Sequence, residues 1–301
     1  VTIFNEVASA FGLTVSVEKS LILHQRKYTN KQFDKVKKEY HEAKKNKQEK
    51  KSGILITHKP LTDVCTTRYL GSMFNKAGDL DTEITKRYGI ARASYDELRK
   101  SVFKSNHINL EAKVKLYNMT VLTRLLWECN NWQLSKSQIK KLESFHFQCL
   151  REMMGKTYRD HITVEEVMKA TKSERLEFQI NMRRLRMVGK IERMDDKLLP
   201  KKIMYGTLDH TKIPSAKCSG NLIKKMKNPF MAVVQKDLKI FNIEENRFKE
   251  LASNRKKFND LIRKSKVEAN EKWIKQKEQE TRARRQRRQE QQEQEQEQNI
   301  N

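Results

Sequence analysis

From Asp79 to about Arg263 the apolar residues recur at three- and four-residue steps, and this helical periodicity constrains the fold more than any other feature of the sequence. The 301 residues include only 9 Gly and 4 Pro. That is too few for a turn-rich all-β sandwich or for a glycine-punctuated dinucleotide fold. The pattern predicts helices over about 81–105, from 109 onward, from 135 onward, over about 173–194, near 230–241 and near 244–263.

Local capping signals fix where two of these helices begin, and they predict a further short helix after Thr163. Asn109 precedes an apolar stripe and is a good N-cap residue. Ser135 is followed three residues later by Gln138, and Thr163 by Glu166, so both segments fit a capping box. The sequence therefore predicts helices that begin directly after Asn109, Ser135 and Thr163.

The first 78 residues have a different pattern. Residues 1–12 are typical of the middle of an amphipathic helix that stops at Gly12, and we interpret the chain as a piece of a longer protein. Residues 13–17 alternate apolar and polar side chains and predict a strand. Further extended pieces are expected at 19–23, 54–57 and 67–74, with a turn at 75–78.

The charge of the chain favours a polyanionic partner. It carries 64 Lys+Arg against 38 Asp+Glu, a formal net charge of +26. Nucleic acid is the first candidate partner and an anionic membrane surface the second, while a basic surface that is merely solvated stays open. No apolar run approaches the roughly 18 residues of a membrane span. Of the two anionic candidates we expect nucleic acid, and no membrane, as the partner.

Four widely spaced cysteines argue against a disulfide scaffold and for reduced thiols inside the cell. Two basic runs, 26–51 and 282–288, could contact phosphates, act as a nuclear-import address or be solvated. We therefore expect the protein to be intracellular, in the nucleus. Beyond Arg263 the chain is almost entirely Lys, Arg, Glu and Gln, which predicts a tail that buries no core and is helical or disordered.

Five segments lie in order along residues 1–262: 11–20 (FGLTVSVEKS), 68–72 (RYLGS), 145–155, 183–196 and 228–239. Together they resemble the C-terminal part of non-LTR, LINE-like retrotransposon endonuclease–reverse transcriptases. Residues 11–20 are similar to the segment that closes the palm, and residues 68–72 to the primer-grip hairpin. Residues 145–155 (FHFQCLREMMG) resemble a thumb helix, and residues 183–196 (RRLRMVGKIERMDD) a stretch downstream of the thumb. Residues 228–239 are a weaker match, and Met187 and Lys190 depart from the family's Trp and His.

The resemblance implies a mainly α fold with a small β remnant of the palm and primer grip. It implies the end of the palm at 1–24, a basic polar linker or insert at 25–53 and a primer-grip-like hairpin at 54–78. A helical thumb at 79–160, a basic helical extension at 161–265 and the charged tail at 266–301 follow.

The family's catalytic aspartates precede the segment that 11–20 resembles, so no catalytic residue is expected in this chain. Mg²⁺ is expected only in the full-length parent, where two metal ions align the primer hydroxyl and the incoming phosphate. Asp195-Asp196 is not an equivalent pair, because it follows a predicted helix instead of lying in a tight turn between strands. His146 and Cys149 lie one turn apart but lack a second ligand pair, so no metal site is expected.

Nine residues are candidates for contacts with nucleic acid or nucleotide. The resemblance places Lys19 near the nucleotide site as an accessory cation, and places a backbone and an aromatic ring of the hairpin against the primer end. The arginine-rich helix suits phosphate oxygens, although neighbouring glutamates could pair with it instead. The candidates are Lys19, Tyr69, Leu70, Gly71, Arg183, Arg184, Arg186, Lys190 and Arg193.

The predicted function is to bind an RNA–DNA or DNA template–primer duplex through its phosphates, while the parent's palm and endonuclease perform the chemistry. This chain alone is predicted to be inactive as an RNA-directed DNA polymerase. Three alternatives stay open: a domesticated nucleic-acid-binding protein without polymerase activity, a non-functional element remnant, and a helical scaffold whose tail binds proteins.

Overall fold

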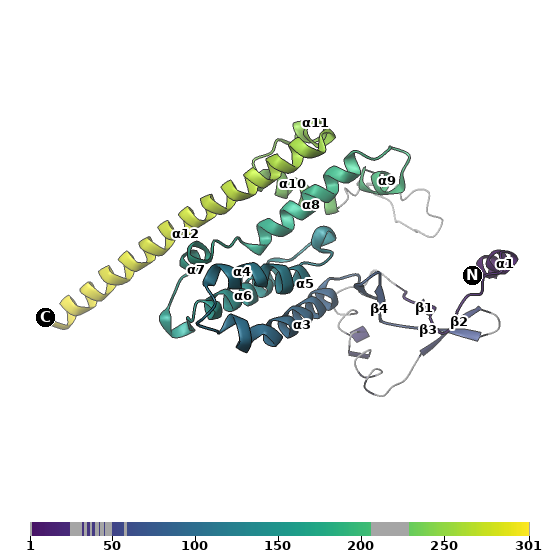
Figure 1. Cartoon of the computed structure of the whole chain (residues 1–301), viewed down its shortest axis with the longest axis horizontal. Helices are drawn as coiled ribbons and strands as arrows, with labels where there is room; N and C mark the ends of the chain where they lie inside the picture. The colour runs from purple at the N-terminus through teal and green to yellow at the C-terminus, as the bar shows by residue number, and fades with distance from the viewer. Residues whose placement is uncertain are drawn as a thin grey trace. The chain divides into compact units, whose positions relative to one another are not determined.

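The computed structural model describes residues 2–24, 50–56, 59–205 and 229–300, with isolated positions between 32 and 45. The chain divides into two compact units, residues 1–90 and 91–301. It is mainly helical, with small sheets near its N-terminus, as predicted (Figure 1). Most of the expected basic linker at 25–53 lies outside the described residues, as does Cys218.

Helix α1 (Thr2–Ala10) opens the first unit and confirms the predicted N-terminal helix. It ends in a Schellman motif, in which Leu13 N donates to Ala8 O over 2.9 Å and Gly12 takes a φ of +71°. Its large apolar side chains are exposed, including Phe4 at 68% and Phe11 at 78%. The amphipathic pattern therefore forms a helix here whose apolar face is largely uncovered by the described residues.

The strand predicted at 13–17 is wrong. Residues 13–16 are irregular and 17–19 form a turn. Strand β1 (Leu21–Ile22) instead pairs in parallel with β3 (Lys59–Asp63), which also pairs with the antiparallel strand β2 (Lys50–Ile56). An alternating segment becomes a strand only if a neighbour satisfies its backbone groups, and the described residues give 13–17 no such neighbour.

Strands β4 (Thr66–Tyr69) and β5 (Ser72–Asn75) form an antiparallel hairpin where the sequence predicted extended chain. Tyr69 pairs with Ser72, so the loop consists of only Leu70 and Gly71. Their φ angles are +48° and +94°. Positive φ at both positions is the signature of a type I′ turn, whose twist matches that of the two strands.

The helices that follow begin where the capping signals predicted. The Asn109 side chain accepts from Ala112 N over 2.8 Å, and complete capping boxes lie at Ser135 and Thr163. Two π-helical turns, η1 and η2, interrupt the regular helices. The elements are α3 (Asp81–Leu98), η1 (Arg99–Phe103), α4 (Leu110–Tyr117), η2 (Asn118–Leu122), α5 (Thr123–Leu125), η3 (Cys129–Asn131), α6 (Lys136–Met153), η4 (Tyr158–Asp160) and α7 (Val164–Thr171).

A second group of helices encloses its own apolar core, which includes Leu185, Val234 and Phe258. The helix predicted near 244–263 is broken, because Asn254 is extended with ψ +102° and separates two helices. The Asn254 side chain then accepts from Lys257 N and starts the last helix. The elements are α8 (Leu176–Glu192), α9 (Leu199–Tyr205), α10 (Pro229–Ile240), η6 (Glu245–Arg247), α11 (Phe248–Ser253) and α12 (Arg255–Ile300).

Helix α12 runs along α8 and past α7 (Figure 1). Asn270 Oδ1 accepts from Arg175 N at the start of α8 over 3.2 Å, and the Arg175 guanidinium lies 4.6 Å from the Trp273 ring centroid. Lys266 pairs with Glu174 at 2.6 Å, and Thr281 reaches Glu165. The tail is therefore helical, and Ala269 and Trp273 in its first part pack against the apolar core, contrary to the expectation that the tail buries no core.

Candidate nucleic-acid interface

The predicted hairpin residues lie at an exposed tip. Tyr69 is 64% exposed and Leu70 81% exposed, and Tyr69 contacts Phe74 edge-on with ring centroids 6.3 Å apart. Gly71 O accepts from Arg87 Nη2 over 2.6 Å. The tip thus presents an aromatic ring and an aliphatic side chain on a turn whose backbone is tied down.

A buried ion pair on α3 holds this hairpin. Glu83 Oε1 accepts from Arg87 Nε over 2.6 Å, and Glu83 Oε2 accepts from Met73 N over 2.6 Å. Both side chains are buried, so each hydrogen bond is costly to lose. Lys19, the proposed accessory cation, lies in the exposed turn at 17–19.

The arginines of α8 are divided between different environments. Arg184 is buried at 3% exposure, pairs with Asp237 of α10 and donates to Trp132 O over 2.7 Å. Burial raises the pKa of Asp237 to about 6, although Arg184 opposes the shift. The Arg184 guanidinium is therefore committed to the core and not presented to phosphate, contrary to the prediction.

Two further candidates also make internal contacts. Arg183 Nη1 donates to Leu126 O over 2.9 Å, and Arg193 Nη1 donates to Ala252 O over 2.6 Å. Lys190 is exposed. The Nε of Arg186 is buried without a hydrogen-bond partner among the described residues, and burial with the neighbouring charges of Arg263 and Arg183 lowers its pKa.

An open groove of about 1180 Å³ lies between the end of α3, the start of α4 and the end of α6. Part of its lining is apolar, including Phe103, Leu110 and Met153, and one lining residue, Glu152, is acidic. The basic side chains come from three separate stretches of chain, 99–104, 113 and 151–156. They are Arg99, Lys104, Lys113, Arg151 and Lys156.

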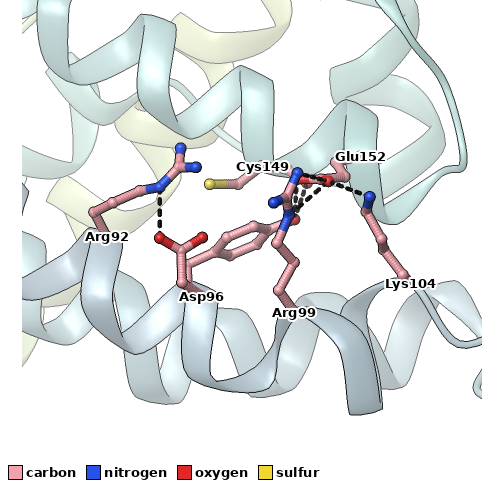
Figure 2. Close-up of polar contacts among 7 residues, drawn as sticks. Arg92, Asp96, Arg99, Lys104, Cys149 and Glu152 are labelled. Atoms are coloured by element: carbon pink, nitrogen blue, oxygen red, sulfur yellow. Dashed lines mark hydrogen bonds and ion pairs between the residues drawn. The ribbon is translucent and has the colours of Figure 1, made fainter.

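Glu152 organises two of these cations. Arg99 Nε donates to its Oε1 over 2.8 Å, Lys104 Nζ lies 3.1 Å from the same oxygen, and Tyr95 donates to Oε2 over 3.1 Å. Figure 2 shows the Arg99 and Lys104 side chains both reaching the Glu152 carboxylate. Burial raises the pKa of Glu152, but the hydrogen bonds from Arg99 and Lys104 outweigh it and lower that pKa overall.

The end of α6 places another cation at the groove. Gly155 has a φ of +69°, and Lys156 N donates to Arg151 O over 2.9 Å in a second Schellman motif. Lys156 is thereby fixed directly after the helix, near Arg151. Lys113 is buried, and its Nζ lies 3.4 Å from Met153 O, so it supports the groove wall more than it faces solvent.

The groove is not predicted from the sequence. Its basic residues lie up to 57 positions apart and share no local motif, because packing of α3 and α4 against α6 brings them together. The one available signal was the glycine stop at the end of α6, which fixes the residue that follows it.

The residues weighed as metal ligands have other contacts. His146 Nδ1 lies 2.9 Å from Tyr117 Oη, and burial lowers the pKa of His146 to about 4. Asp196 pairs with Lys201 at 2.7 Å, and Asp195 accepts from Lys197 N. Within the described part of the chain, no group of three or more His, Cys, Asp or Glu is arranged to hold a metal ion.

No protein family model matches the chain, and neither a curated protein nor a solved structure is significantly similar to it. Across the ranges that the structure describes, no helix is both long and apolar enough to cross a membrane. Function is therefore inferred from the residues and their geometry.

Proposed function

We propose that this chain is the template–primer-binding, C-terminal part of a LINE-like reverse transcriptase. It binds an RNA–DNA or DNA duplex through phosphates and has no polymerase activity by itself. The observation that carries the proposal is the basic groove lined by Arg99, Lys104, Arg151 and Lys156.

The charges of the groove suit a phosphate backbone better than a small anion. Its cations are spread along an open surface, and Lys104 and Lys156 keep side-chain exposures of 52% and 44%. A duplex offers phosphates at regular intervals, so several cations can each neutralise one. Contacts of this kind position the protein without reading base sequence.

The sequence resemblance supports the same function. The basic residues of the groove lie within residues 79–160, the segment that the resemblance assigns to the thumb. The exposed hairpin tip at Tyr69–Gly71 falls in the segment assigned to the primer grip. If about six phosphates are neutralised, log K should fall with log salt with a slope of roughly −4 to −5.

The proposal is tested by measuring binding as a function of salt to a recessed RNA–DNA template–primer, a blunt DNA duplex and heparin. The groove variant is Lys104→Gln/Arg151→Gln/Lys156→Gln. A matched control removes three exposed lysines outside the groove, as Lys202→Gln/Lys236→Gln/Lys239→Gln.

We expect the wild-type chain to prefer the recessed hybrid. The groove variant should lose that preference and about 2 to 3 units of salt slope, because each phosphate contact contributes roughly 0.7 to 0.9. The control should change little beyond the effect of net charge. Equal binding to all three polyanions, or equal losses in both variants, would favour a basic nucleic-acid-binding protein without a template–primer role.

A further inference from the structure

The exposed part of α12 carries an unusual concentration of positive charge. Five of the seven residues in 282–288 are arginine, and the stretch from Thr281 to Gln289 contains no acidic residue. All side chains from 282 to 292 are exposed. We call residues 282–288 the arginine segment.

The arginine segment is held as a helix by contacts at its base. Lys169 of α7 pairs with Glu278, and Thr281 Oγ1 lies 3.5 Å from Glu165 Oε1. Beyond α7, Figure 1 shows the end of α12 extending without another helix beside it. The segment is therefore a preformed helix that begins where docking onto the helical unit ends.

The arrangement of charge on this helix is unfavourable for the free chain. Arg284 and Arg288 are four residues apart, and Arg285 and Arg288 are three apart, so like charges face one another on adjacent turns. Arg284 has only a weak pair, 3.9 Å from Glu280, and that carboxylate already pairs with Lys277 at 2.5 Å. A helix that was merely solvated would be more stable with its glutamates interspersed among these arginines.

We infer that the arginine segment binds the phosphate backbone of a nucleic-acid duplex, as a contact separate from the groove. At 1.5 Å per residue, the segment spans about 10 Å. One strand of B-DNA presents a phosphate about every 3.4 Å of helix axis, so a segment that lies along this axis passes about three phosphates of the strand. Phosphates also relieve the repulsion among the arginines, and each guanidinium can bind two phosphate oxygens.

The inference does not depend on the proposed function. The arginine segment lies outside the residues that resemble a reverse transcriptase, and backbone contacts require neither a primer end nor a hybrid. The test therefore uses blunt DNA duplex with the full chain, in the wild-type background and in the groove-variant background.

The test variant is Arg284→Gln/Arg285→Gln/Arg288→Gln, which removes three charges and keeps good helix-forming residues. Its matched control is Arg255→Gln/Lys256→Gln/Lys257→Gln, three exposed cations at the other end of the same helix. Circular dichroism establishes that both variants keep the helix content of the wild type.

We expect the test variant to lose about 2 to 3 units of salt slope and, at 0.1 M salt, about 100-fold in affinity for duplex. The loss should be similar in both backgrounds. Duplex should also slow hydrogen exchange of the amides in 282–288 of the wild type, because bound phosphates remove the repulsion that frays the segment.

Three results would overturn the inference. The control variant could lose as much affinity for duplex as the test variant, which would show that the loss follows from net charge and not from the arginine segment. Phosphatidylserine vesicles could bind the segment while duplex did not. The wild type could self-associate through the segment, with the test variant abolishing association and leaving duplex affinity unchanged. If the template–primer preference fails while the test variant still loses slope on blunt duplex, only the proposed function fails.

Discussion

His146 should make the helical unit, residues 91–301, less stable as the pH falls from about 6.5 to 4. The ring is buried at 1% exposure beside Tyr117 and Phe147, and burial lowers its pKa to about 4 from an ordinary value of 6.5. In this interval the unfolded chain binds a proton that the folded chain does not. Stability from the neutral ring is therefore complete above about pH 6.5 and is lost as the pH falls toward 4.

The size of the effect follows from the pKa difference. Lowering the pKa of His146 from 6.5 to about 4 corresponds to about 3 kcal/mol of unfolding free energy, at about 1.36 kcal/mol for each pH unit. Asp237 acts in the opposite direction, because its raised pKa of about 6 makes the folded state bind the extra proton between about pH 4 and 6. The two contributions must be separated by a variant.

The assay is urea unfolding between pH 4.5 and 7.5, followed by tryptophan fluorescence. All three tryptophans, Trp127, Trp132 and Trp273, lie in the helical unit, so the signal reports that unit. Between pH 7.5 and 4.5, the free energy of unfolding should fall by up to about 3 kcal/mol less in His146→Phe than in wild type, because Asp237 is present in both. Tyr117→Phe keeps the titrating imidazole ring, so its free energy of unfolding should depend on pH as in wild type. Equal pH dependences in wild type and His146→Phe would refute the reasoning.

Two further predictions concern the hairpin and the groove. Gly71→Ala should destabilise the hairpin by about 1 kcal/mol, and Leu70→Asn should stabilise it by up to about that amount, because both positions have positive φ. Hydrogen exchange of the β5 amides measures both changes, and the reverse order would contradict the turn assignment. Glu152→Gln should weaken duplex binding and reduce the salt slope by about 1 to 2, because Arg99 and Lys104 lose the carboxylate that orients them. This loss is expected even though the substitution makes the net charge of the chain more positive. Salt titration decides this, and tighter binding would show that the cations act independently of Glu152.

The features that the sequence predicted well depend on neighbouring residues. The helix starts after Asn109, Ser135 and Thr163 follow from hydrogen bonds that span only three positions. The stop at Gly12 likewise depends on one residue with positive φ. Such signals carry their own partners within one turn of chain, so tertiary packing does not alter them.

The features that it predicted poorly depend on distant partners. Arg184 and Arg186 belong to one helix turn, but Asp237, 53 positions away, draws Arg184 into the core. The segment at 13–17 alternates apolar and polar side chains like a strand. The described sheet instead pairs β3 with β1 and β2, so no strand among the described residues pairs with 13–17. The basic residues of the groove come from three stretches of chain, and their separation in the sequence does not reveal that they lie close together in the fold.

The docking of α12 has a consequence for the order in which the chain folds. Asn270 caps α8 across 95 residues, and Thr281 reaches Glu165 across 116. Phe258 and Ile262 of α12 complete the core that α8 and α10 share. Ribosomes make a chain from its N-terminus, so α8 must wait with an uncovered apolar face until these residues have emerged. Folding of this core therefore has to wait until α12 has been synthesised.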